Sequence, residues 1–122
     1  MNEAKTWSNS LTYCLSVNST LASIHDPGTD NFLFNLSPSG YWVGGVRTAE
    51  TGDNFAWVDQ SPYNYNNWAS SGQPDNQEGI ENRIQVFKGP SGDGNTYDEP
   101  KWNDRPDDTP LFSICQYDAL SN

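Results

Sequence analysis

Two groups of oxygen-donating side chains lie in segments of the chain that have no helix or strand periodicity. The first group surrounds Pro74 and comprises Gln73, Asp75, Asn76, Glu78, Glu81 and Asn82. The second group comprises Asn103, Asp104, Asp107 and Asp108. Carboxylates and amides without a neighbouring histidine or cysteine suit a hard cation such as Ca²⁺, and not Zn²⁺ or copper. Composition alone leaves a second interpretation open, in which these acids are only the solvated face of polar loops.

The chain contains few residues that could serve nucleophilic catalysis. His25 is the single histidine, and Cys14 and Cys115 are the two cysteines, so we expect no Ser/His/Asp or Cys/His arrangement. A glycosidase using paired acids is the remaining enzymatic alternative. Because cation binding explains the acids better, the sequence predicts a protein that is not an enzyme.

Charge and composition exclude several classes of partner. The 122 residues include 6 Lys and Arg against 16 Asp and Glu, which gives a formal charge of −10. Nucleic acids and anionic membrane surfaces need a basic face, so neither is expected as a partner. No apolar run approaches the roughly 18 residues of a membrane span, and no membrane insertion is expected. The five Trp, six Tyr and five Phe argue against disorder.

The two cysteines lie near opposite ends of the chain, and two interpretations compete. They are either buried free thiols of a cytosolic protein, or they close one loop of about a hundred residues. A disulfide would indicate an oxidising compartment.

The periodicity of the chain predicts the elements that position these side chains. Trp7, Leu11, Cys14 and Leu15 form a helical stripe within residues 7–17, and the turn 26–30 caps a second helix with Phe32, Leu33 and Leu36 on one side. Extended segments are expected at 21–24, 41–46, 55–58, 83–87, 101–102 and 111–115. Residues 59–80 and 89–100 are expected to be turn-rich, and a loop as long as the first of these is usually functional. This order indicates an α+β domain.

An ordered set of motifs resembles the C-type lectin-like domain family over nearly the whole chain. The matching segments are Trp7 with Cys14, Leu21–His25, Asn31-Phe32, Tyr41–Gly45, Phe55–Asp59, Asn67-Trp68, Gly72–Asn76, Trp102–Asp104 and Phe112–Cys115. A single short motif such as Trp-Asn-Asp is weak evidence for the family. The complete series in the family's order and spacing is specific.

The resemblance implies one C-type lectin-like carbohydrate-recognition domain over residues 1–122. Its double-loop α+β fold packs two helices on small antiparallel sheets beside a long calcium- and sugar-binding loop region, with a Cys14–Cys115 bridge. It implies one strong Ca²⁺ site. The metal ligands carried over are Gln73, Asp75, Glu81, Asn103 and Asp104, and the sugar-binding residues are Gln73, Asp75, Glu81, Asn103 and Tyr97.

The order Gln73-Pro74-Asp75 resembles the family's galactose-type arrangement, whereas Glu-Pro-Asn is the mannose type. The expected function is therefore Ca²⁺-dependent binding of galactose or N-acetylgalactosamine. We expect a secreted protein whose partners are galactose-type glycans, glycoproteins or microbial polysaccharide. A homo-oligomer is a further hypothesis. The alternative is an interaction module of the same fold for ice, mineral or protein, with calcium serving structure only.

Three features depart from the family pattern. No aromatic residue stands at 76–80 to stack on a sugar, which leaves Tyr97 as the expected stacking residue. The family's inner disulfide is replaced by Arg83 and Asp107, which are either an ion pair or two unrelated surface charges. Few residues precede Trp7, where many family members have a strand that pairs with the last one. Either that first strand is dispensable here, or Leu111–Gln116 presents an open edge.

Overall fold

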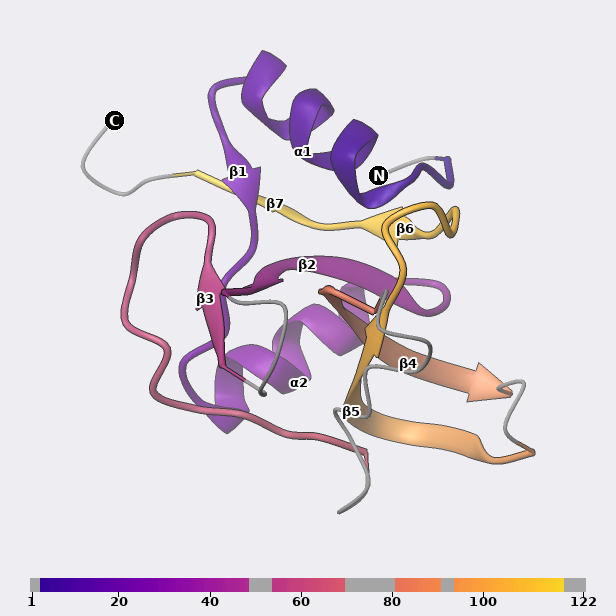
Figure 1. Cartoon of the computed structure of the whole chain (residues 1–122). Helices are drawn as coiled ribbons and strands as arrows, with labels where there is room; N and C mark the ends of the chain where they lie inside the picture. The colour runs from indigo at the N-terminus through magenta and orange to yellow at the C-terminus, as the bar shows by residue number, and fades with distance from the viewer. Residues whose placement is uncertain (1–2, 49–53, 70–80, 91–93, 118–122) are drawn as a thin grey trace.

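The computed structural model describes residues 3–48, 54–69, 81–90 and 94–117 (Figure 1). Its elements follow the order α1 (Trp7–Ser16), β1 (Thr20–Leu21), α2 (Pro27–Leu36), β2 (Tyr41–Arg47), β3 (Phe55–Trp57), β4 (Arg83–Pro90), β5 (Thr96–Arg105), β6 (Phe112–Ser113) and β7 (Cys115–Gln116). Two helices on antiparallel sheets confirm the predicted α+β class. Among the described residues, none of the helices is both long and apolar enough to cross a membrane.

Both helices begin at residues whose side chains cap them. The Thr6 hydroxyl accepts a hydrogen bond from the Asn9 backbone N–H at 3.2 Å, and the Asp26 carboxylate accepts one from Thr29 at 2.7 Å. Such oxygens satisfy amide donors that the first helical turn leaves unpaired. Pro27 suits the start of α2 because its missing N–H would have no partner there. The predicted cap at 26–30 is confirmed.

The predicted buried side of α2 is wrong in part. Phe32 and Leu36 are 63% and 50% exposed, whereas Leu33 and Phe34 are buried together with Asp30. On this buried face the Asp30 carboxylate accepts hydrogen bonds from β5 and from residues 65–67, as described below. In α1, Leu15 of the predicted stripe is likewise 60% exposed.

The central sheet has the order β3-β2-β4-β5, and β6 pairs with β2 in parallel. A second, two-stranded sheet joins β1 to β7. Figure 1 shows α1 beside β1 and β7, and α2 on the other side of β2. The β2 strand therefore lies between the two helices.

Alternate side chains of β2 enter two different cores, as expected for a strand covered on both faces. Tyr41 and Val43 join a cluster with α2 and the other strands, whereas Trp42 packs with Trp7 of α1. The Trp7 indole N–H donates to the Val43 carbonyl at 2.8 Å, which fixes α1 on the sheet. Trp102 is fully buried in the first cluster, and Trp68 packs against that cluster.

The β4–β5 hairpin is longer than the sequence predicted. Residues 83–87 were expected as a strand, but β4 continues to Pro90, and β5 begins at Thr96 within the segment expected to be turns. The ladder shifts register between Phe87 and Gly89, and Gly89 has φ +75°, a value that glycine adopts readily. Cross-strand pairing thus overrides the weak strand preference of residues 96–100.

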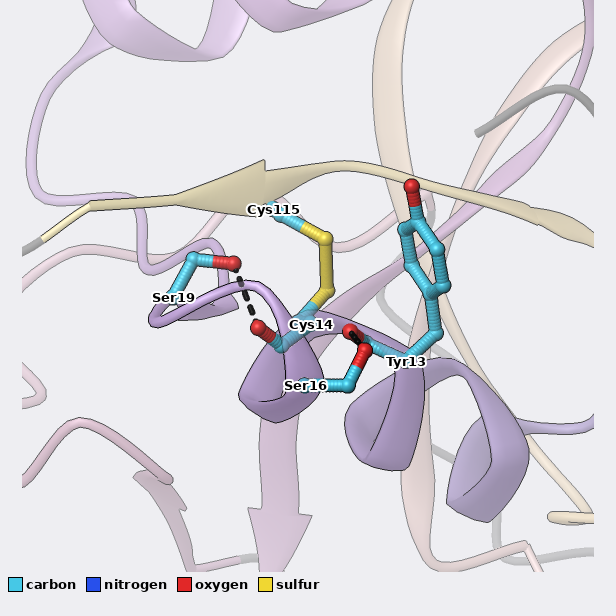
Figure 2. The surroundings of a disulfide bond; sticks show 5 residues. All are labelled: Tyr13, Cys14, Ser16, Ser19 and Cys115. Carbon is cyan, nitrogen blue, oxygen red and sulfur yellow. Dashed lines mark hydrogen bonds between the residues drawn. A yellow bond between two sulfur atoms is a disulfide. The ribbon is translucent and has the colours of Figure 1, made fainter.

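The last predicted strand is divided into β6 and β7, and the predicted 21–24 segment is shortened to Thr20–Leu21. Cys115 of β7 forms a disulfide with Cys14 of α1, with Cα atoms 5.5 Å apart (Figure 2). The Ser19 hydroxyl donates to the Cys14 carbonyl at 2.7 Å, which secures the turn that follows α1. The disulfide interpretation of the two cysteines is therefore confirmed.

The short N-terminal segment pairs with the strand edge that was expected to lack a partner. Lys5 and Leu111 form an antiparallel bridge with two backbone hydrogen bonds of 2.9 Å. Leu21 of β1 pairs with Cys115 further along the same edge. Residues 111–116 are thus paired near both ends.

Candidate functional site

The last residues of β2 and β5 and the first residues of β4 lie together at one edge of the central sheet, the edge that runs across the strand ends. Val46 pairs with Arg83, and Arg83 pairs in turn with Arg105. The Arg47 backbone N–H donates to the Asn82 carbonyl at 2.9 Å. This register brings three of the predicted metal ligands, Glu81, Asn103 and Asp104, to the same edge.

Asp104 is fully buried and forms an ion pair with a residue that the sequence had not singled out. Its Oδ2 lies 2.6 Å from Nη2 of Arg47. The two side chains are 0% and 1% exposed. A buried carboxylate needs a compensating charge and hydrogen bonds, and the guanidinium supplies both.

The Arg47 guanidinium also binds Glu81, which lies two positions before β4. Its Nε and Nη2 donate to the Glu81 carbonyl at 3.3 and 3.1 Å. The guanidinium carbon lies over the Phe55 ring, 4.7 Å from the ring centroid. One cation therefore links the ends of three strands and binds atoms of both Glu81 and Asp104.

Asn103 faces away from Asp104, because successive side chains of a strand point to opposite faces. Its amide nitrogen donates to the side-chain Oε1 of Gln85 at 3.1 Å, and Gln85 lies directly across the ladder. Arg105 donates to the same Gln85 oxygen at 3.3 Å. The Asn103 side chain is nearly buried and is held by its nitrogen, so its oxygen is the atom that suits a cation.

Of the other predicted site residues, the structure describes only Tyr97, which lies away from this edge. Gln73 and Asp75 lie outside the described residues. Tyr97 pairs with Gly89 at the far end of the hairpin, six residues and roughly 20 Å along β5 from Asn103. Its ring stacks on Phe87 with centroids 4.5 Å apart.

The donors present fit Ca²⁺ in their chemistry. Glu81, Asn103 and Asp104 offer hard carboxylate and amide oxygens, the ligands that Ca²⁺ prefers. Gln85 binds the amide nitrogen of Asn103, and Arg47 binds Oδ2 of Asp104. Outer partners commonly hold metal ligands in this way. Within the described ranges no group of three or more His, Cys, Asp and Glu forms a metal cluster. The two other predicted ligands, Gln73 and Asp75, lie outside these ranges.

Sequence reasoning missed Arg47 and Gln85. Arg47 ends a strand that is otherwise apolar, and a basic residue in such a place needs a buried partner. That signal could have drawn attention to Arg47. Gln85 had no such signal, because the alternation of its strand is compatible with an exposed amide.

A serine, a histidine and an aspartate do meet elsewhere, beside β7. The Ser23 hydroxyl donates to Asp59 Oδ2 at 2.6 Å, and Nε2 of His25 lies 3.2 Å from the Ser23 oxygen. In a catalytic triad the acid holds the histidine, which in turn contacts the serine. Here the acid binds the serine directly, and His25 contacts Asn64 with its other nitrogen. The arrangement is that of a structural cluster.

A second buried carboxylate, Asp30, lies beneath the loop that precedes β4. It accepts hydrogen bonds from Asn67 at 3.0 Å, from the Trp102 indole at 3.3 Å and from Tyr65 at 3.4 Å. Burial raises the pKa of Asp30, and the hydrogen bonds only partly oppose that rise. Asp30 thus ties α2 to β5 and to residues 65–67.

Comparisons with known proteins agree with this architecture. The Lectin C-type domain family matches residues 3–117. Human C-type lectin domain family 4 member K is 31% identical over 117 residues, which cover 92% of this chain and 33% of that protein. Perlucin of Haliotis laevigata is 31% identical over 113 residues, covering 88% of this chain and 67% of that protein. The chain thus spans about a third of the first relative and two thirds of the second.

Solved structures show the same fold. The C-type lectin CEL-I of Cucumaria echinata superposes with a TM-score of 0.78 at 26% identity, covering 94% of this chain and 84% of that chain. The cow C-type carbohydrate-recognition domain of CD23 gives 0.72 at 29% identity, covering 92% and 78%. A calcium-independent type II antifreeze protein gives 0.75 at 23% identity, covering 93% and 78%. With the family match over nearly all of its length, the chain belongs to the Lectin C-type domain family, a family of carbohydrate-binding domains and not of enzymes.

Proposed function

We propose that this chain is a Ca²⁺-dependent carbohydrate-binding domain that takes galactose-type glycans. The observation that supports the proposal is the strand register, which brings the backbones of Glu81, Asn103 and Asp104 to one edge of the sheet in a chain of this family. The sequence Gln73-Pro74-Asp75 supplies the remaining oxygen donors and the order typical of galactose binders.

The proposed ligands of the ion are Gln73, Asp75, Glu81, Asn103 and Asp104. Bound Ca²⁺ would offer coordination positions to two neighbouring sugar hydroxyls. The acid and amide side chains that hold the ion would also exchange hydrogen bonds with those hydroxyls. Acids only accept and amides both donate and accept, so the order of Gln73 and Asp75 selects the hydroxyl pair.

A relative that was solved with a glycan present supports carbohydrate as the ligand class. The cow domain was solved in the presence of a GlcNAc2Man3 oligosaccharide. A single shallow site is weak, so avidity from several copies would strengthen binding to glycoproteins or microbial polysaccharide. The disulfide between Cys14 and Cys115 supports a secreted protein, because such bonds persist in oxidising compartments.

One observation favours the second candidate, a non-sugar interaction module of the same fold. Tyr97 is stacked on Phe87 at the far end of the hairpin, and residues 76–80 contain no aromatic side chain. A galactose ring would therefore lack the usual aromatic platform. We do not include Tyr97 among the proposed sugar contacts. The antifreeze protein shows that this fold is compatible with another activity.

Calorimetric titration of galactose, with mannose as the control sugar, tests the proposal. Galactose binding in Ca²⁺ that disappears in excess EDTA is the expected result. If Ca²⁺ binds and neither sugar does, the interaction-module alternative holds instead. Galactose binding that is unchanged in EDTA would contradict the calcium-dependent mechanism.

A further inference from the structure

A pocket with a cavity volume of about 270 Å³ opens beside β4, between the end of β5 and the turn that precedes β2. Its apolar walls include the side chains of Phe87, Leu111 and Phe112. Gln85 and Arg105 line it as well. No Asp or Glu is found among the described residues that line this pocket, although the chain has 16 acids against 6 basic residues.

The Gln85 side chain presents hydrogen-bond donors to the pocket. Its Oε1 accepts from Asn103 at 3.1 Å and from Arg105 at 3.3 Å, and these two donors fix which way the amide faces. The Nε2 atom lies beside Gly40, where an added Cβ would stand 3.5 Å from it. Gln85 is only 4% exposed, and in the described part of the chain no acceptor binds its Nε2. A nearly buried amide without an acceptor is costly, so a ligand oxygen at this position would stabilise it.

The Arg105 side chain indicates that this ligand is an anion. One guanidinium nitrogen donates to Gln85, and the ion pairs between described residues do not include Arg105. Lys88 also lines the pocket, but its ammonium already donates to the carbonyl oxygens of Phe34 and Ser37, at 2.6 Å each. The other guanidinium donors of Arg105 and the Gln85 NH₂ group therefore form one donor set with a positive charge.

We propose that this pocket binds a small organic carboxylate whose apolar body packs on Phe87 and Phe112. One carboxylate oxygen accepts from the Arg105 guanidinium and the other from Gln85 Nε2, since a carboxylate only accepts and has two oxygens. A bare inorganic anion would leave the apolar walls without contacts. The net charge of −10 opposes non-specific attraction of anions, so binding depends on this donor set. The inference does not rest on the proposed function.

Titration with benzoate, followed by NMR in EDTA and without sugar, tests the proposal. Benzamide is the matched ligand, because it has the same ring and no charge. We expect benzoate to bind with a dissociation constant of about 1 mM or tighter, at least about tenfold tighter than benzamide. It should also shift the side-chain NH₂ signals of Gln85. Glucuronate carries its carboxylate on a sugar ring, and we expect it to bind more weakly than benzoate because the walls are apolar.

Two variants assign the binding to these side chains. Arg105→Met should weaken benzoate binding at least about tenfold, because it removes the charge that the carboxylate meets. Gln85→Glu keeps an oxygen for Asn103 and Arg105 but replaces the donating NH₂ group with an acceptor, so benzoate binding should be lost. Lys101→Met is the matched control. It removes a positive charge from the same strand, at a side chain that contacts Asn67 and does not line the pocket, and it should retain benzoate binding.

Several outcomes would overturn the inference. Equal affinities for benzoate and benzamide would show that the pocket does not select an anion. Benzoate binding that survives in Gln85→Glu would place the ligand elsewhere, and this variant decides the question if melting curves show that Arg105→Met does not fold. Tighter binding of glucuronate than of benzoate would contradict the role of the apolar walls. Because the titrations contain neither Ca²⁺ nor sugar, their result is independent of whether the chain binds galactose.

Discussion

The Nε of Arg83 lies 3.5 Å from the Oδ2 of Asp107, at the two positions where the family's inner disulfide is expected. The sequence left open whether these residues form a pair, and the ion pair is confirmed. Asp107 also accepts hydrogen bonds from the backbone N–H and hydroxyl of Ser8 at 3.1 and 2.6 Å. Arg83 covers the Trp7 ring. The two charges therefore connect β4 and the segment after β5 to the start of α1.

Asp107→Ala should destabilise the fold by about 1–2 kcal/mol. Most of this loss comes from the Ser8 contacts at the helix start, because the ion pair with Arg83 is partly exposed and such pairs contribute at most about 1 kcal/mol. Urea unfolding measures the difference. Asp108→Ala is the control, since the neighbouring Asp108 is exposed and its loss should change stability by less than about 0.5 kcal/mol. Equal effects of the two changes would contradict the assigned role of Asp107.

The double variant Cys14→Ala/Cys115→Ala should lose roughly 4–5 kcal/mol of stability. The bond spans 101 positions, and closing so long a loop removes much of the entropy of the unfolded chain. Unfolding of the variant should match that of the unaltered chain in reductant. If the variant is as stable as the oxidised protein, α1 and β7 are held together by their packing alone.

The sequence predicted those elements whose buried side chains form a regular local pattern. Residues 41–46 and 83–87 are apolar or alternate regularly, and both form strands. The first half of β5 was missed because Asp98, Glu99 and Pro100 have little strand preference of their own. Their conformation is set by pairing with β4, an interaction that no local window contains.

The candidate site was predictable to the extent that it depends on motifs. Glu81, Asn103 and Asp104 were placed in one site by resemblance, and the strand register brings their backbones to one edge. Arg47 was not found, because its partner Asp104 is 57 positions away and the pair belongs to no quoted motif. A buried ion pair between distant residues follows from topology, which periodicity does not supply.

Asp30 and Asp59 should respond to pH in opposite directions. Burial raises the pKa of Asp30, so its stabilising contribution is present below the unfolded pKa of about 3.9 and is lost as the pH rises through the folded pKa. Burial also acts to raise the pKa of Asp59, but hydrogen bonds from Ser23, Ser61 and Gln116 together outweigh it and the pKa is lowered. The contribution of Asp59 is therefore present above about 3.9 and is lost as the pH falls through its folded pKa.

The variants Asp30→Asn and Asp59→Asn separate these contributions. Relative to the unaltered chain, Asp30→Asn should gain stability as the pH rises from about 3 to about 7, because the amide carries no charge to bury. Asp59→Asn should lose relative stability over the same range. Each variant serves as the control for the other, and urea unfolding at several pH values measures both. Parallel pH profiles would show that neither carboxyl has a shifted pKa.

Exchanging the acid and the amide should change the sugar preference. In Gln73→Glu/Asp75→Asn the order becomes Glu-Pro-Asn, the mannose-type arrangement, so donors and acceptors trade places around the hydroxyl pair. Each unpaired polar group left in the wrong complex costs about 1–3 kcal/mol, and the preference for galactose should reverse by tenfold or more, a factor that corresponds to about 1.4 kcal/mol. Competition by free galactose and free mannose for an immobilised glycan measures the preference.

Glu78→Gln is the control for this exchange, because it alters a nearby acid that is not among the proposed ligands. It should retain the galactose preference of the unaltered chain. If the exchanged variant loses both sugars yet still binds Ca²⁺, the two positions hold the ion without selecting the hydroxyls. Selectivity would then have to come from side chains beyond the proposed ligands, and the order Gln73-Pro74-Asp75 would not determine the sugar.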